Sequence, residues 1–200
     1  MSALLANRGY FSSVRPGTST MLINVNTVTS AFLRPILVSK FIARMKSAGC
    51  PPQLISKSLV GKSARITYQR LHHNPDTDPD PNAFRNVCIT AIGKPVAKEV
   101  NYKKLQNDFK ASPVLDYFKN TFSKQKTNKL DPEAPCVNVG YVPRDDKDED
   151  RHKARWIPSD CLELLANQPF THLLPSKLSN SMIARALQDP ASNANLIMTE

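Results

Sequence analysis

The stretch Pro113-Val-Leu-Asp-Tyr-Phe-Lys-Asn-Thr-Phe122 is the one helical pattern in a block, residues 59–170, that otherwise consists mainly of short strands. Ser112 before it is a suitable N-cap, and proline fits the first helical position. Three apolar side chains are spaced to share one face of this helix: Val114, Phe118 and Phe122. Tyr117 lies beside that face, so its ring is available either to solvent or to a neighbouring groove.

Strand patterns lie on both sides of this helix. Before it, residues 64–71 alternate in polarity, and residues 84–92 form a second apolar run that ends at Gly93. After it come a short strand at residues 136–141 and the segment Trp156-Ile-Pro, which leads into a helical turn. About five strands with one inserted helix predict a small open barrel of the oligonucleotide-binding type.

The two ends of the chain have different patterns. Residues 1–13 are small and polar, and we expect them to lack regular structure. Residues 20–29 read as a strand, and residues 35–48 read as an amphipathic helix with Pro35 in its first turn. A last helix is expected near residues 178–187. We therefore expect a strand-helix segment over 1–58, a β-rich domain over 59–170, and a further segment over 171–200.

The charge of the chain points to an anionic partner. Its 200 residues include 27 lysines and arginines against 17 acidic residues, a formal net charge of +10. Nucleic acid is the first candidate for such a partner and an anionic membrane the second. The hydrophobic content of 40 % is enough for a buried core, so the composition excludes a disordered tail.

The basic residues are concentrated in residues 94–129, a segment that contains nine lysines and only three acidic residues. Five aromatic residues are interleaved with them: Tyr102, Phe109, Tyr117, Phe118 and Phe122. Proteins that bind single strands use lysines along the phosphate backbone and aromatic rings that stack on the bases. A solvated basic face over an ordinary aromatic core fits the same composition equally well.

Other candidate sites fail on spacing. Gly61-Lys62-Ser63 lacks the upstream glycine of a phosphate-binding loop. His72-His73 has no second pair of ligands at metal-site spacing, and no paired carboxylates or nucleophile-base order is visible. The four cysteines are far apart, and we interpret them as buried thiols in a reducing compartment. We expect neither an enzyme, nor a metal site, nor a cofactor.

Several motifs resemble the Argonaute family, and they occur in the family's order. Three segments near the start are similar to the end of its first linker: Gly9-Tyr-Phe-Ser-Ser-Val-Arg-Pro-Gly17, Met21-Leu-Ile-Asn-Val-Asn26 and Thr29-Ser-Ala-Phe32. Four later segments resemble its PAZ domain: Phe84-Arg-Asn-Val-Cys-Ile-Thr90, Val114-Leu-Asp-Tyr-Phe-Lys119, Pro135-Cys-Val-Asn-Val-Gly140 and Trp156-Ile-Pro-Ser-Asp-Cys-Leu-Glu-Leu164. Ser181-Met-Ile-Ala-Arg-Ala186 resembles the start of the second linker.

The resemblance implies a barrel with an inserted hairpin and helix, and the 3′ end of a guide RNA held between them. It implies that Tyr117 contacts the terminal phosphate, that Arg85 lies near the backbone, and that Trp156 and Ile157 line the terminal ribose. Tyr102 is the expected aromatic under the last base, and two neighbours are the alternatives: Val100 and Phe109.

The chain departs from the family pattern at several of these positions. Phe84 and Phe122 stand where tyrosine is usual, so stacking is expected to replace a hydrogen bond to phosphate. Tyr68 stands where histidine is common. Thr121 stands where lysine is common, and a nearby lysine is expected to compensate, either Lys119 or Lys124.

The expected function is therefore to anchor the 3′ end of a small siRNA-like or miRNA-like guide in RNA silencing, without chemistry of its own. The partner would be a single-stranded 3′ end or a 3′-overhang duplex, with MID and PIWI regions as further partners, in the cytoplasm or alternatively in the nucleus. The chain would be an Argonaute fragment or a truncated gene product. Two alternatives stay open: the PAZ domain of a Dicer-like ribonuclease, which the Val-Arg-Pro motif disfavours, and a degenerate scaffold that no longer binds RNA.

Overall fold

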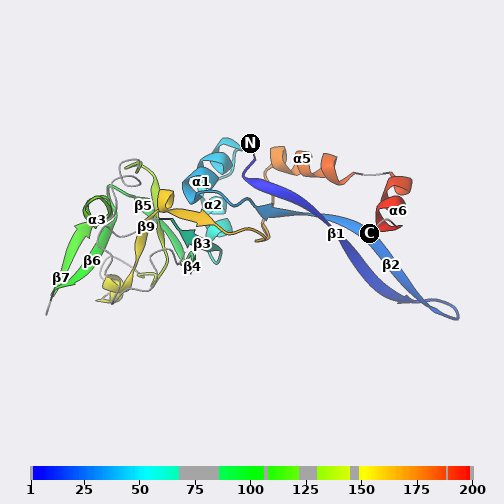
Figure 1. Ribbon diagram of the computed structural model, residues 1–200, viewed down its shortest axis with the longest axis horizontal. Helices are drawn as coiled ribbons and strands as arrows, with labels where there is room; N and C mark the ends of the chain where they lie inside the picture. The colour runs from blue at the N-terminus through cyan, green and yellow to red at the C-terminus, as the bar shows by residue number, and fades with distance from the viewer. Residues whose placement is uncertain are drawn as a thin grey trace.

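A long hairpin at one end of the molecule precedes a β-rich body (Figure 1). The computed structural model describes residues 2–67, 86–105, 108–121, 130–144, 149–187 and 189–198. Strands β1 (Leu4–Pro16) and β2 (Met21–Leu33) pair antiparallel along their whole length. The strand predicted over residues 20–29 is thus confirmed. The prediction that residues 1–13 lack regular structure is wrong, because Leu4–Pro16 pair with Met21–Leu33 and helices pack against this hairpin.

Two helices connect the hairpin to the body. Helix α1 (Val38–Ser47) confirms the predicted amphipathic helix, although it begins three residues after Pro35 because Leu37 at the N-cap is extended, with ψ 139°. Helix α2 (Pro52–Leu59) was not predicted. In the sequence, Pro51-Pro52 indicated only the end of the preceding helix. In the structure, Pro52 occupies the first turn of a new helix.

Two three-stranded antiparallel sheets form the body. One has the order β10-β3-β4 and contains Leu162–Leu164, Ser63–Ile66 and Asn86–Cys88; the other has the order β5-β8-β9 and contains Ala91–Pro95, Pro135–Asn138 and Trp156–Pro158. The expected β-rich fold with helices is confirmed. Over the described residues these small sheets do not close into a barrel.

The strand predicted over residues 84–92 is divided between the two sheets. The backbone N–H of Ile89 donates to the carbonyl of Lys62 at 2.9 Å, whereas the next N–H, of Thr90, donates to the carbonyl of Asn138 at 2.8 Å. The chain therefore leaves one sheet and enters the other within two residues. The same transition recurs where the 3-10 turn η2 (Ser159–Cys161) joins β9 to β10.

An insertion extends from the body at the end opposite the long hairpin (Figure 1). It consists of the hairpin β6 (Val100–Leu105) and β7 (Asp108–Pro113), followed by helix α3 (Val114–Thr121). The predicted helix is confirmed, with Pro113 ending the strand before it. A hairpin followed by a helix is the inserted element that the resemblance implies. A further 3-10 turn, η1 (Glu149–Lys153), lies near β6.

Two C-terminal helices lie along the long hairpin (Figure 1). Helix α5 (Ser176–Ala186) confirms the predicted last helix, and α6 (Pro190–Met198) follows it without having been predicted. Hydrogen bonds from Ser192 to the Asp189 carboxylate hold the start of α6 and lower the pKa of that carboxyl group. No helix in the described part of the chain is long and apolar enough to span a membrane.

The core runs from the base of the hairpin through α1 and α2 into both sheets. Its largest fully buried side chains include Leu33, Phe41, Met45, Leu59, Ile89 and Leu162. Three of the four cysteines are buried as expected, whereas Cys88 is exposed on the edge strand β4. The expectation that all four thiols are buried is therefore wrong for Cys88.

Gln168 joins the hairpin to the body. Its side-chain Oε1 accepts from the backbone N–H of Ser63 at 2.6 Å, and its Nε2 donates to the Ser63 carbonyl at 2.8 Å and the Leu165 carbonyl at 2.9 Å. Its own backbone carbonyl accepts from Leu33 at 2.8 Å. One residue therefore binds the start of β3 with its side chain and the end of β2 with its backbone.

We expect Gln168→Ala to lower the free energy of unfolding by about 1–3 kcal/mol, because it leaves the part-buried backbone N–H of Ser63 without its partner, although the Ser63 carbonyl still accepts from Leu165. Urea denaturation of the whole chain measures the change. Gln53→Ala is the matched control, since Gln53 is exposed on α2. Equal stability of the two variants would contradict the role given to Gln168.

Candidate nucleic-acid interface

Trp156, the only tryptophan of the chain, lies on the edge strand β9. Its side chain is half-buried and packs against the core. A Cβ atom placed on Gly93 of β5 would come within 2.4 Å of Cζ3 of the indole and 2.7 Å of Oε2 of Glu99. The indole therefore occupies the space that a side chain at position 93 would fill.

The sequence interpretation missed this contact. Gly93 was taken as the end of a strand, whereas it lies inside β5. A glycine in a strand interior often marks the close approach of another group, and that is the signal that was available. The partner could not be inferred, because 63 positions separate Gly93 from Trp156 in the sequence.

Asn101 on β6 holds the backbone of Trp156. Its Nδ2 donates to the Trp156 carbonyl at 2.8 Å, and the Trp156 N–H donates to its Oδ1 at 3.0 Å. This pair of hydrogen bonds connects the insertion to the body. It was not predicted, since an asparagine between Val100 and Tyr102 carries no motif.

Glu99 and the start of α3 strengthen the same connection. Oε2 of Glu99 accepts from the backbone N–H of Lys94 at 3.0 Å, and the Glu99 carbonyl accepts from the N–H of Val114 at 2.9 Å.

Burial, the Glu99 carboxylate and Cys161 together raise the pKa of the Cys136 thiol far above its usual range. Cys136 is therefore a neutral core residue and is poorly suited to act as a nucleophile.

Helix α3 presents aromatic and charged side chains beside β9, with which it is in contact. Val114 and Phe118 are buried, as the predicted apolar face requires. Tyr117 is half-buried, and its ring centroid lies 5.7 Å from that of Phe118 at an interplanar angle of 74°, an edge-to-face arrangement. Lys119 is exposed on the same helix.

The structure brings part of the predicted site together. Tyr117, Lys119 and Trp156 lie on two elements in contact, α3 and β9. Ile157 is only 5 % exposed and belongs to the core, so its side chain lies beneath the surface that Trp156 reaches. The backbone of Tyr102 pairs with Ala111. The side chain of Tyr102 lies outside the described residues, as do four other predicted residues: Tyr68, Phe84, Arg85 and Phe122.

The electrostatics around this region are basic. Lys94 and Lys98 are exposed at the root of the insertion, and Lys119 is exposed on its helix. Two acids of the same region are Glu99, whose carboxylate accepts from the backbone N–H of Lys94, and Asp116, which is exposed on α3. Across the described part of the chain, no three histidine, cysteine or acidic side chains gather closely enough to hold a metal ion.

Comparison with known proteins gives matches over nearly the whole chain. The Argonaute linker 1 domain family matches residues 2–34, which contain both strands of the long hairpin. Protein argonaute 10 of Arabidopsis thaliana is 21 % identical over 95 % of this chain and 18 % of its own length. Protein argonaute 1A of Oryza sativa subsp. japonica is 19 % identical over 92 % of this chain and 15 % of its own length. Protein argonaute 4 of Arabidopsis thaliana is 23 % identical over 97 % of this chain, which spans 20 % of that relative.

We expect Gly93→Ala to displace the indole of Trp156, because the new methyl group would overlap it. The emission maximum of the single tryptophan should shift to longer wavelength, and quenching by acrylamide should increase. Gly9→Ala is the control, since a Cβ at Gly9 meets nothing within 4 Å. An unchanged emission spectrum in folded Gly93→Ala protein would contradict the packing described here.

Proposed function

This chain belongs to the Argonaute family, and we propose that its residues 59–170 form a PAZ-type module that holds the 3′ end of a small guide RNA. The chain spans about a fifth or less of the length of the curated relatives it matches, so the proposal concerns one step within a larger protein's activity. That activity would be RNA silencing.

The observation that carries the proposal is the position of Trp156. A half-buried indole at the edge of a sheet, next to a basic inserted hairpin and helix, offers an aromatic surface where a base or ribose could pack. Stacking on an aromatic ring tolerates any base and contributes roughly 1–3 kcal/mol per base. Lys119, exposed on the insertion, and Lys94 and Lys98, exposed at its root, would attract the phosphate backbone independently of sequence.

The proposal includes an oligonucleotide-binding type of barrel as the platform. The passage of the chain from one sheet to the other at Ile89–Thr90, and again from β9 through η2 to β10, supports it. In barrel-like packings of two sheets, the corners are made by strands that pass from one sheet to the other through bulges or bends. The 3′ end would then lie between this platform and the insertion.

We propose no reaction for this module. Glu99, the acid that lies against Gly93 and Trp156, serves a structural role through its bond to Lys94, and the buried Cys136 thiol is held neutral. Binding and release of the guide end would be its contribution, and cleavage of a target would depend on other regions of an Argonaute.

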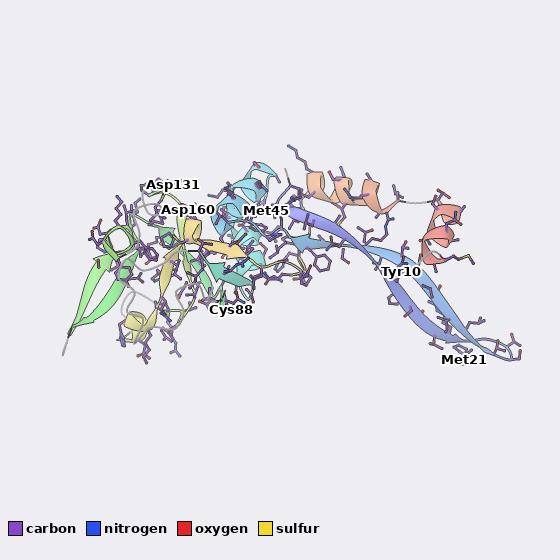
Figure 2. All side chains as sticks on the ribbon, viewed as in Figure 1. Tyr10, Met21, Met45, Cys88, Asp131 and Asp160 are labelled. Atoms are coloured by element: carbon purple, nitrogen blue, oxygen red, sulfur yellow. The ribbon has the colours of Figure 1, made fainter. Side chains whose placement is uncertain are left out.

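MID and PIWI regions are the further partners in this proposal. The long hairpin supports a protein partner, because eight large apolar side chains are exposed on it: Tyr10, Phe11, Val14, Met21, Leu22, Ile23, Val25 and Val28. Figure 2 shows Tyr10 midway along the hairpin and Met21 near its tip, both far from the body. Exposed apolar surface of this extent is typical of an interaction site.

The Argonaute linker 1 match at residues 2–34 favours an Argonaute over a Dicer-like ribonuclease. A scaffold that has lost RNA binding is the remaining alternative. Direct measurement of end recognition distinguishes that scaffold from a working module.

We expect a duplex with a two-nucleotide 3′ overhang to compete better than a blunt duplex of equal charge, because only an unpaired end can reach Trp156. A bulky group on the 3′ hydroxyl should weaken binding, whereas a group on the 5′ end should not. Competition at one fixed salt concentration measures all four duplexes. Trp156→Ala should remove much of the overhang preference and leave a salt-dependent background. Equal competition by every duplex would favour the scaffold.

We expect Tyr117→Phe to weaken binding of the overhang duplex by about 1–3 kcal/mol, the range for a hydrogen bond to a charged group, here the terminal phosphate. Tyr117→Ala should weaken it further. Tyr10→Phe, on the outer hairpin, is the control and should bind as the parent does. A folded Tyr117→Phe variant with parental affinity would remove Tyr117 from the site.

A further inference from the structure

Strand β9 is held from both of its edges, and the backbone N–H and C=O of Trp156 serve only one of them. On one edge β9 pairs with β8, where Asn138 lies opposite Trp156. On the other edge no strand follows in this sheet among the described residues, because β9 is last in the order β5-β8-β9. The N–H and C=O of Trp156 are bound on that edge by the carboxamide of Asn101, at 3.0 and 2.8 Å.

A carboxamide is suited to this position because it presents one donor and one acceptor side by side, as a strand would. The bonds join residues 55 positions apart. They also fix α3, since Asn101 pairs across the hairpin with Ser112, two residues before the first residue of the helix that carries Tyr117. Asn101 therefore sets the position of α3 relative to β9.

The indole ring is fixed by different contacts. It lies over Gly93, and Glu99 lies against the same space. Asn101 bonds only to the backbone of Trp156, so it acts on the ring indirectly, through the position of the strand that carries it. Its side chain carries no charge, and its loss leaves the lysines that attract phosphate unchanged.

We propose that Asn101 is a positioning residue for end recognition, which holds the insertion against Trp156 so that a free 3′ end is distinguished from a duplex end. This inference rests on the proposed function, because the distinction concerns the RNA end that the module would bind. Asn101 contributes little to the unspecific affinity, which arises from the basic residues.

The test uses the whole chain and compares Asn101→Ala with Asn120→Ala. Asn120 is the matched control, an exposed asparagine on α3 of the same insertion. The first measurement is acrylamide quenching of the single tryptophan without RNA. Asn101→Ala should raise the quenching constant, because the backbone N–H and C=O of Trp156 have lost the hydrogen-bond partner that both share, and Asn120→Ala should not.

The second measurement is the ratio of affinities for overhang and blunt duplexes. Asn101→Ala should lower this ratio by about tenfold, which corresponds to about 1.4 kcal/mol. Its affinity for the blunt duplex and the dependence of that affinity on salt should match those of Asn120→Ala. A general loss of protein stability would instead weaken the binding of both duplexes by a similar factor.

A second variant keeps the inference testable if Asn101→Ala does not fold. Asn101→Asp keeps the acceptor for the Trp156 N–H and nearly the same volume, but loses the donor to the Trp156 carbonyl. Its added charge acts on both duplexes, so the ratio remains the readout, and it should fall as for Asn101→Ala.

Parental quenching and a parental ratio in a folded Asn101 variant would overturn the inference. If the parent chain itself shows no preference for the overhang, the proposed function fails. In that case the quenching measurement alone decides whether Asn101 positions Trp156, so the two failures are distinguishable.

Discussion

The pairing of Gln168 with Ser63 is the constraint on which the arrangement of hairpin, body and C-terminal helices depends. A side-chain amide here replaces a stretch of sheet, with hydrogen bonds to both backbone groups of one residue. Because the Gln168 carbonyl also binds Leu33, and Phe170 binds Ala31 at 2.8 Å, the same short segment extends the hairpin. The direction of the hairpin relative to the sheets follows from this junction, and so does the point from which α5 and α6 return along it.

Asn101 repeats the same solution at the other end of the body. Both residues use a carboxamide to bind the backbone of a strand edge where no neighbouring strand is available. A charged side chain would perform this task poorly, since it offers only donors or only acceptors. The two carboxamides thus contribute neutral, directional contacts at the two ends of the body and use none of its surface charge.

The sequence predicted the elements whose buried side chains recur periodically. It did not predict the structure where backbone pairing between distant residues determines the path of the chain. The amphipathic pattern of residues 35–48 predicted α1, and the spacing of Val114 and Phe118 predicted α3, because a core-facing stripe repeats each turn. Strand β1 has no such pattern, since most of its side chains are in water. The division at Ile89–Thr90 depends on carbonyls of Lys62 and Asn138, which no local pattern reveals. For the site, the motif order predicted Tyr117 and Trp156, but Gly93 and Asn101 required the coordinates.

The junction at Gln168 also has a consequence for the order of events on the ribosome. Strands β1 and β2 are adjacent in sequence and can pair as soon as they emerge, because their turn closes a short loop. The contacts that attach them to the body require residues 168–170, more than 130 positions later than Leu33. A nascent chain would therefore carry a paired but unanchored hairpin, with Leu33 and Ala31 still exposed, throughout synthesis of the body. Such an intermediate has unpaired strand edges and apolar surface, the two properties that recruit chaperones to growing chains.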